Sequence, residues 1–477
     1  MRVVLINTPY LDLYGAINVG HNSYFPLGLG YIAAVLREGG HEAHLLDPEA
    51  EGLTREELLA RILEIQPDLV GISCATPAFK SARAIADMVK KNTPALVVVG
   101  GVHVSSHPKE ILESCAEFDV VVFGEGEITS LEICQRYKAG HPESLENIAG
   151  LVYRVQGEVK QNPPRLKIAD LDSLPLPARD LVNLDNYRLQ PLFDHGVKSA
   201  TMITSRGCPS HCTYCASFLT MGKKFRAHSP EYTIREIKHL VEKYGVKHIY
   251  FVDDTFTMDR QRVFRICELL DKEKIKIKWT FFGRVDTVDE ELLRVMREHG
   301  ADQIIFGIES GDLQVLKNIR KEVTLEQCRQ ALSISNKLGY RTHASFMIGC
   351  PGDTRETIER TIQFARELDP STVGFGIMVP YVGTPEFIKN YRGQLAEIDN
   401  WENWIGIGKE PPIDRTASGL TGQDLQRLLY KAYMSFYFRP RPLLRYLKMA
   451  VRPRQFVSFL TGGFGLLRQM LIWKKKK

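Results

Sequence analysis

Several features that would assign this chain to a simple class are missing from it. Its 477 residues contain no uninterrupted apolar run long enough to cross a bilayer, so we expect no membrane-spanning helix. The nine cysteines are not spread in the pattern of a disulfide framework, which favours a reducing compartment. The first residues, Met-Arg-Val-Val-Leu-Ile, are typical of a strand and not of a secretion signal. We therefore expect a cytoplasmic protein of ordinary globular composition, with 44% hydrophobic and 25% charged residues.

Acidic residues are absent from the end of the chain. From Lys431 to Lys477 there are 12 Lys and Arg and no Asp or Glu, whereas the other residues hold 50 basic and 57 acidic groups. Basic residues mixed with Phe, Tyr, Leu and Trp are typical of short helices in a membrane interface, where each basic side chain contributes about 1 kcal/mol. We expect this tail to contact a membrane surface and not nucleic acid, at the inner membrane face. A helical cap on the preceding domain is the alternative.

Three cysteines stand close together, in the run Arg-Gly-Cys-Pro-Ser-His-Cys-Thr-Tyr-Cys. Cys208, Cys212 and Cys215 follow a C-x3-C-x2-C spacing inside one short loop. A structural zinc site would need a second Cys or His pair elsewhere, and no such pair follows. Three neighbouring thiolates suit an iron–sulfur cluster, and a four-iron cluster with three protein ligands leaves one iron open to another ligand. We predict that these three cysteines bind a four-iron four-sulfur cluster.

This loop resembles that of the radical S-adenosylmethionine (SAM) superfamily. The resemblance implies that the open iron chelates the amino and carboxylate groups of SAM. It also implies that one electron, from a flavodoxin or ferredoxin-like donor, cleaves SAM to a 5′-deoxyadenosyl radical.

The first part of the chain alternates short apolar runs with helical stretches. Runs near residues 2–7, 44–47, 69–73, 95–100 and 120–123 predict a doubly wound parallel sheet, whose ligands bind at the carboxyl ends of the strands. Unusual residues gather at those ends, and glycine there lets the backbone approach a flat ligand. The candidates are Asn7, Tyr10, Ser73, Thr76, Gly100, Gly101, Val102, His103, Gly124, Glu125 and Gly126.

The pattern Gly-Gly-x-His followed by Gly-Glu-Gly-Glu resembles the cobalamin-binding, Rossmann-like domains that are fused to radical SAM enzymes. Many cobalamin-binding domains also carry D-x-H-x-x-G, whose His ligates cobalt from below. Here the matching loop, residues 12–15, holds no His, and His21 reads as a loop residue. We therefore expect cobalamin with no protein His on the metal, a state that favours nucleophilic cob(I)alamin.

Strand and helix signals alternate again after residue 195 and predict a partial (β/α)6 TIM-type barrel. Six strands are expected, near 200–204, 248–252, 278–283, 303–308, 342–348 and 373–379. We divide the chain into a cobalamin-binding domain (1–145), a linker (146–195) with a small hairpin near 152–160, the barrel (196–390), and a helical, basic and aromatic extension (391–477).

Active sites of such barrels lie at the carboxyl rim, and the resemblance assigns SAM contacts to the strand ends there. Asp253 or Asp254 is expected to meet the ammonium group, unless this stretch merely precedes a helix capped by Asp259. Arg284 is expected to meet the carboxylate, with a surface salt bridge as the alternative. The remaining contacts implied by the family's ribose- and adenine-binding segments are Glu309, Ser310, Met347, Gly349 and, in the cluster loop, Tyr214.

The resemblance implies a cobalamin-dependent radical SAM methyltransferase acting through methylcobalamin and the deoxyadenosyl radical. An unactivated C–H bond is not acidic, so radical chemistry suits such a carbon. We expect a small-molecule or lipid substrate, a hydrophobic and membrane-resident one such as a hopanoid-like terpenoid. The alternatives are an oxidative cyclase of the Mg-porphyrin type, a carbon–carbon bond-forming enzyme, and a non-catalytic cofactor-sensing module at a membrane.

Overall fold

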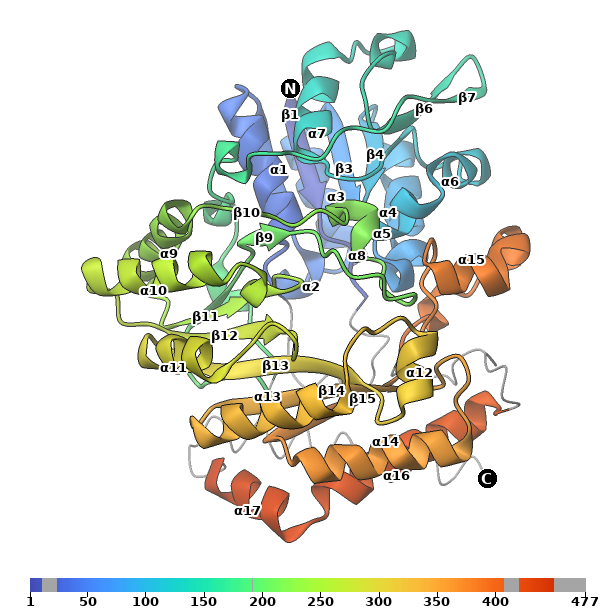
Figure 1. The fold of residues 1–477 in the computed structure, drawn as a ribbon. Helices are drawn as coiled ribbons and strands as arrows, with labels where there is room; N and C mark the ends of the chain where they lie inside the picture. The colour runs from blue at the N-terminus through green and yellow to red at the C-terminus, as the bar shows by residue number, and fades with distance from the viewer. Residues whose placement is uncertain (11–23, 191, 407–419, 450–477) are drawn as a thin grey trace.

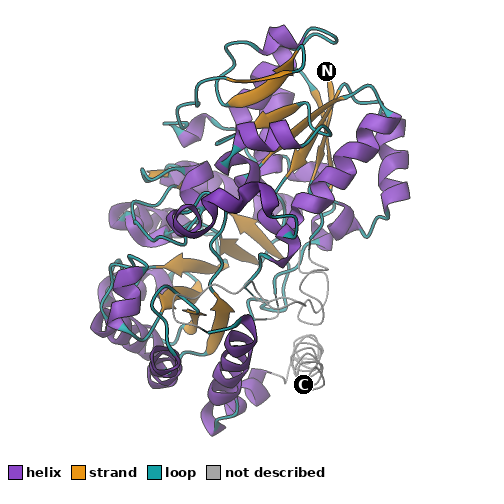
Figure 2. Cartoon of the chain, turned by 90° about the vertical axis from the view of Figure 1, so that its right-hand side faces the viewer, coloured by secondary structure: helices purple, strands orange, loops and turns teal. Residues whose placement is uncertain are grey.

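The computed structural model describes residues 1–10, 24–190, 192–406 and 420–449. Two α/β units, each built on a mainly parallel sheet, lie one above the other (Figures 1 and 2). The expected α/β fold with a Rossmann-like domain and a six-stranded partial barrel is confirmed. No helix in the described ranges is long and apolar enough to cross a membrane.

The first sheet has seven strands in the order β2-β1-β3-β4-β5-β6-β7, and its first five strands are parallel. These five are β1 (Arg2–Ile6), β2 (Glu42–Leu46), β3 (Leu69–Ser73), β4 (Leu96–Gly100) and β5 (Val120–Val122). The main helices on its faces are α1 (Leu27–Glu38), α3 (Arg55–Ile65), α4 (Phe79–Asn92) and α7 (Glu127–Arg136).

The expected hairpin belongs to this first sheet and not to a free linker. Strand β6 (Leu151–Val155) pairs antiparallel with β5, and β7 (Glu158–Gln161) extends the sheet by one more strand. The first sheet therefore continues past residue 145, where composition alone suggested that the domain ends. Sequence pattern identified the hairpin but could not show which edge it joins.

The second sheet is fully parallel, in the order β15-β14-β13-β12-β11-β8. Each of its six strands matches an expected one, and β15 and β8 form the two open edges of the partial barrel. The bounds are β8 (Ser199–Met202), β11 (His248–Phe251), β12 (Lys278–Gly283), β13 (Ala301–Glu309), β14 (Arg341–Ile348) and β15 (Thr372–Ile377).

Helices cover the outer face of the second sheet because every second strand residue is apolar and points toward them. Outward residues such as Phe281, Phe306 and Phe375 form one core with these helices. The helices are α9 (Pro230–Tyr244), α10 (Arg260–Lys272), α11 (Glu290–Glu298), α12 (Leu313–Asn318), α13 (Leu325–Lys337) and α14 (Arg355–Leu368).

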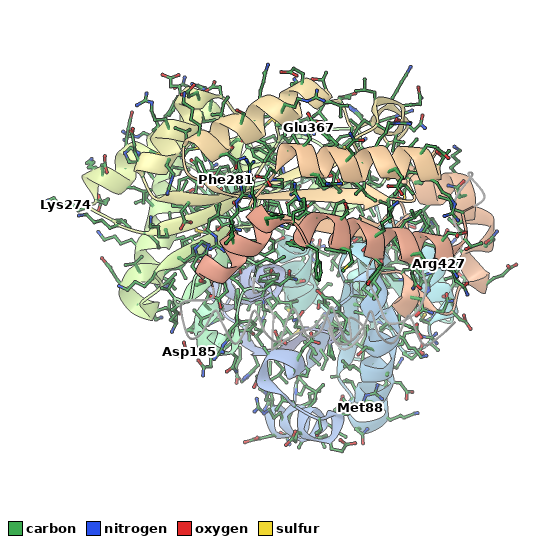
Figure 3. All side chains as sticks on the ribbon, turned by 90° about the horizontal axis from the view of Figure 1, so that it is seen from below. Met88, Asp185, Lys274, Phe281, Glu367 and Arg427 are labelled. Carbon is green, nitrogen blue, oxygen red and sulfur yellow. The ribbon has the colours of Figure 1, made fainter. Side chains whose placement is uncertain are left out.

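The chain after the barrel packs on both units. Trp401 and Trp404, near helix α15 (Pro385–Tyr391), are buried against the helices of the first sheet. Helix α16 (Gly422–Tyr437) then lies along β15 and α14, as Figure 3 shows for the elements that carry Arg427 and Glu367. A last described helix, α17, spans Pro440–Met449.

Candidate active site

The cysteine loop leaves the first barrel strand and is held in place by main-chain hydrogen bonds. The three thiols of Cys208, Cys212 and Cys215 are free and half-buried. Within the loop, the N–H of Thr213 donates to the carbonyl of Ile319 at 3.0 Å, and the carbonyl of Thr213 accepts from the N–H of Glu386 at 3.2 Å. The loop is thus fixed between the α12–α13 connection and α15.

Two cations face this group of thiols. Burial raises the pKa of the Cys212 thiol, but the neighbouring Lys321 and Arg284 lower it in turn. Arg284 also donates to Ser210 of the same loop at 2.8 Å. A set of sulfur donors beside cations fits a thiolate-ligated iron–sulfur cluster, because the metal ligand is the deprotonated thiol.

Glu309 occupies a strained position beside the cysteine loop. Its φ is +72°, in the left-handed region that few non-glycine residues adopt, and its side chain is buried. Lys321 lies 3.5 Å from its carboxylate. Burial raises the pKa of the Tyr214 hydroxyl well above its usual value, and the adjacent Glu309 adds to the shift. The geometry therefore brings Glu309, Tyr214 and Lys321 together next to Cys212.

Gly307 makes room for the Glu309 carboxylate. A Cβ atom at position 307 would lie 2.5 Å from Oε1 of Glu309. Only glycine can occupy this position without moving that carboxylate, so the Gly-Ile-Glu spacing has a steric reason.

The two aspartates after β11 take different positions. Asp253 is 1% exposed and accepts hydrogen bonds from Thr204 and Ser205, at the end of the strand that leads into the cysteine loop. It therefore braces this strand end, and its carboxylate is already saturated. Asp254 is an exposed residue, and Ser217 hydrogen-bonds to its carboxylate. The helix cap that we weighed as an alternative is also present, since Asp259 caps α10.

The other expected SAM contacts also differ in their surroundings. Arg284 forms a paired contact with Asp286 at 2.8 Å, so the ion pair that we considered as an alternative exists, beside the cluster loop. Ser310 is fully buried and bonded to Thr361, which leaves it a structural position. Met347 stays partly exposed on the inner face of β14, and Gly349 packs against Leu425 of α16.

The inner face of the barrel is layered. At the amino-terminal ends of the strands, His248 bonds to Thr280 at 3.0 Å, and His195 bonds to Gln303 at 3.1 Å. A largely aromatic layer follows, formed by Tyr250, Phe282 and Ile305 with Phe193.

The third layer, at the carboxyl rim, consists of small and apolar residues that remain partly exposed: Val252, Gly307, Met347 and Gly376. The barrel is thus closed at its base and open at its rim, where active sites of such barrels lie.

The strand ends of the first sheet carry a polar network at β1 and β3. Asn7 donates to Asp47 at 3.0 Å and accepts from Ser73 at 3.3 Å. Burial raises the pKa of the Tyr10 hydroxyl, and the nearby carboxylates of Glu49 and Asp47 add to the shift. The loop that was expected to lack a cobalt-ligating His, with His21 beyond it, lies outside the described residues.

The Gly-Gly-Val-His segment turns the chain sharply after β4. Gly101 has φ +115°, and a Cβ there would lie 2.5 Å from the carbonyl oxygen of Cys74. His103 is 1% exposed, bonds to Thr76 at 3.3 Å and packs against Trp401. Burial lowers the pKa of His103 to about 3, so the ring is neutral. The side chains of His103 and Thr76 thus face the core, which the motif did not reveal.

The Gly-Glu-Gly-Glu segment after β5 also differs from its expected arrangement. Gly124 and Gly126 lie at the turn into α7, as expected. The Glu125 side chain, however, is buried and pairs with Arg206 and Arg226 of the barrel unit, each at 3.0 Å. It is directed away from an open strand edge. Sequence reasoning did not find the two arginines, although Arg206 lies only two residues before Cys208.

The residues that remain at the edge are small and partly exposed. They are Ser73, Gly100, Gly101, Val102 and Gly124. Because these residues carry small side chains or none, a large flat ring such as a corrin could approach the backbone here.

Comparisons with known proteins agree with this geometry. Residues 202–365 match the radical SAM superfamily, and residues 15–133 match the B12 binding domain family. An uncharacterized methyltransferase from Pyrococcus horikoshii is 37% identical over 421 residues, which cover 88% of this chain and 89% of that protein. The chain belongs to the radical SAM enzymes that carry a B12-binding domain.

Other relatives of these radical SAM enzymes are more distant. An anaerobic magnesium-protoporphyrin IX monomethyl ester cyclase from Cereibacter sphaeroides is 28% identical, covering 98% of this chain and 76% of that protein. A hopanoid C-3 methylase from Methylococcus capsulatus is 29% identical, covering 78% of this chain and 70% of that protein. The solved structure of OxsB, a cobalamin-dependent SAM radical enzyme, aligns with TM-score 0.72 at 20% identity over 96% of this chain and 72% of that one.

The family membership confirms the expected class, a radical SAM methyltransferase, and the three expected cofactors: a four-iron four-sulfur cluster, SAM and cobalamin. The three cysteines would hold the cluster, Tyr214, Glu309 and Arg284 lie near Cys212, and the small residues at the first sheet's edge are the candidates for cobalamin. The non-catalytic sensing module is not supported, since the relatives are enzymes.

Proposed function

We propose that this enzyme methylates an unactivated carbon of a hydrophobic small molecule, with a hopanoid-like terpenoid as the substrate class. The supporting observation is the inner rim of the barrel, where Val252, Met347 and Gly376 are apolar or small and partly exposed. When bound, SAM at the cluster supplies a deoxyadenosyl radical, which removes hydrogen from the substrate. Cobalamin supplies the methyl group that the substrate carbon receives.

The chain's own residues position the reactants. Arg284 and Lys321 place positive charge beside the thiolates, and Asp254 offers an exposed carboxylate for an ammonium group. Glu309 presents a buried carboxylate that can accept hydrogen bonds from a diol. The aromatic layer of Tyr250 and Phe282 closes the floor, so water does not reach the rim from below.

Product analysis tests this proposal. The anaerobically reconstituted enzyme is incubated with methyl-labelled SAM, a chemical reductant and a panel of terpenoids that includes hopanoids. We expect labelled product together with both S-adenosylhomocysteine and deoxyadenosine. If deoxyadenosine forms but neither S-adenosylhomocysteine nor a labelled substrate is found, the result would instead indicate the cyclase class.

We also propose the surface on which a flavodoxin or ferredoxin-like electron donor docks. A hollow beside the cysteine loop is lined by His211, Lys317 and Arg320. The next residue, Lys321, also lines this hollow and lies near Cys212. These basic residues complement the acidic surface of such donors. Charge reversal of Lys317 and Arg320 should slow SAM cleavage with flavodoxin but not with dithionite. Equal slowing with both reductants would contradict this docking site.

Contact with the inner membrane face stays a proposal for the basic tail. The described part includes Phe438 and Leu444, which are 68% and 58% exposed beside basic residues, whereas residues 450–477 lie outside the described ranges. Co-sedimentation should show binding to anionic vesicles and none to neutral ones. No binding to anionic vesicles would contradict it.

A further inference from the structure

Four buried charged side chains join the two halves of the molecule. Glu125 and Glu127 come from the first unit, and Arg206 and Arg226 from the barrel unit, and each is at most 8% exposed. Arg206 lies 3.0 Å from Glu125 and 2.7 Å from Glu127, and Arg226 lies 3.0 Å from Glu125. We call these four residues the interdomain charge cluster.

The two arginines flank the cysteine loop, and the two glutamates lie at the turn after β5. Both segments are expected to lie at a cofactor. Arg206 and Arg226 are direct partners in the short antiparallel ribbon of β9 (Ser205–Arg206) and β10 (Arg226–Ala227), and the cysteine loop is the chain between them. Glu125 and Glu127 frame the turn from β5 into α7, at the carboxyl edge of the first sheet. Figure 1 shows β9 and β10 between the two sheets.

A third segment closes the contact. The N–H of Ile168 donates to Glu125 at 2.9 Å, and its carbonyl accepts from Arg226. Arg226 also donates to the carbonyl of Met221, in α8 (Ser217–Met221) behind the cysteine loop, at 2.7 Å. The Arg206 guanidinium lies over the ring of Tyr31 in α1, 5.2 Å from its centre. The ribbon around the cysteine loop is therefore tied to α1, β5 and the linker at once.

Buried charges are costly to desolvate, so they persist only with matched partners and fixed geometry. The nearby carboxylates hold the pKa of Arg206 above its usual value despite burial, so its charge is retained. The planar Arg206 guanidinium spans the two carboxylates, with Nη1 toward Glu125 and Nη2 toward Glu127, and Nη1 of Arg226 contacts Glu125 from a second strand. Three charged contacts of this kind permit little sliding between the units. An apolar contact of equal area is not directional, so it would allow a wider range of positions of one unit relative to the other.

We propose that the interdomain charge cluster sets the position of the cysteine loop relative to the carboxyl edge of the first sheet. Glu125 and Glu127 are then positioning residues for methyl transfer and not contacts of cobalamin. The inference rests on the proposed function, because methyl transfer requires the same substrate carbon to react first with the radical and then with the methyl group. A shift of about 1 Å in such an arrangement can cost about a hundredfold in rate.

The test measures position separately from activity. Pulsed electron paramagnetic resonance can measure the distance between the reduced cluster and cob(II)alamin in the anaerobic holoenzyme. We expect one narrow distance distribution for the wild type. Glu125→Gln and Glu127→Gln should broaden or shift it, while the iron and cobalamin contents stay unchanged.

Activity gives the second readout. In the same variants we expect the deoxyadenosine formed per methylated product to rise about tenfold, because radical formation continues while methyl capture fails. The control is Glu367→Gln, which removes one partner of the Arg329–Glu367 pair between α13 and α14, on the outer side of the barrel. It should leave both the distance distribution and the product ratio unchanged.

A double variant that leaves no unpaired buried charge serves in case the single variants do not fold. Glu125→Gln with Arg226→Gln removes one charge of each sign and leaves Arg206 paired with Glu127. It should also broaden the distance distribution. An unchanged distribution in all folded variants would overturn the proposal, whatever the substrate. A narrow wild-type distribution without any methylated product would instead overturn the proposed function alone.

Discussion

At the scale of single residues, the site depends on backbone positions that few side chains tolerate. Glu309 adopts a left-handed backbone conformation beside the cysteine loop, and it does so next to Gly307. Strain of this kind persists where the surrounding structure fixes the conformation, and it is frequent at functional sites. The glycine and the glutamate therefore act as one unit.

Gly307→Ala tests that unit. The added methyl would lie 2.5 Å from the Glu309 carboxylate, so the carboxylate must move. We expect SAM affinity to fall about tenfold, equivalent to about 1.4 kcal/mol, in anaerobic equilibrium dialysis. Gly393→Ala is the control, because a Cβ there meets no atom within 4 Å. Equal SAM affinity in wild type and Gly307→Ala would contradict the assignment of Glu309.

Residue identity could be predicted from sequence more readily than side-chain direction. The spacing of Cys208, Cys212 and Cys215 predicted neighbouring thiols, and in the structure all three are free and half-buried. The same reasoning placed His103 and Glu125 at an open edge, but one packs against Trp401 and the other pairs with arginines of the barrel unit. The partners of both lie far along the chain, so no local pattern could reveal them.

At the scale of elements, β15 is an edge strand, with no neighbouring strand on its outer side in the described sheet. Its backbone N–H and C=O groups on that side therefore need other partners. Helix α16 supplies it with two tyrosines one turn apart. The hydroxyl of Tyr433 accepts from the N–H of Phe375 and donates to its carbonyl, and Tyr437 does the same for Val373. Helix α16 thus caps this edge of the barrel, and of the basic tail, for which a cap was the alternative, residues 431–437 belong to it.

Removing either hydroxyl should destabilise this edge. In Tyr433→Phe or Tyr437→Phe, a buried N–H and carbonyl lose their partner, which costs about 1–3 kcal/mol in the free energy of unfolding. Hydrogen exchange of the Val373 and Phe375 amides should accelerate in the matching variant. Tyr430→Phe, at an exposed position, should change neither quantity. Unaltered exchange at both amides would show that the tyrosines do not protect the edge.

At the scale of the whole molecule, two cofactor-binding units are joined by buried contacts that the sequence did not predict. The strand and helix alternation predicted both sheets, because period-two and helical patterns are local. The join depends on pairs such as Arg206 with Glu127, and on Trp401 against His103, which are set by tertiary packing. Buried histidines contribute to this packing, and they make stability depend on pH.

Acid should weaken the fold through these histidines. Burial lowers the pKa of His103 to about 3 and those of His228 and His343 to about 4, so all three stay neutral when folded near pH 5. The unfolded chain takes up protons below pH 6.5, so stability falls as pH falls, by about 1.4 kcal/mol per pH unit for each histidine. His103→Phe should therefore reduce the slope of unfolding free energy between pH 6.5 and 5 by about that amount. An unchanged slope would mean that His103 is protonated in the folded state.

The metal centre is tested most directly by iron analysis and electron paramagnetic resonance of anaerobically reconstituted protein. The wild type should bind about four iron and four sulfide per chain, and its reduced spectrum should change when SAM is added, because SAM binds the open iron. Alanine at Cys208, Cys212 or Cys215 should abolish the signal. A colourless wild-type protein that binds zinc at these cysteines would contradict the assignment.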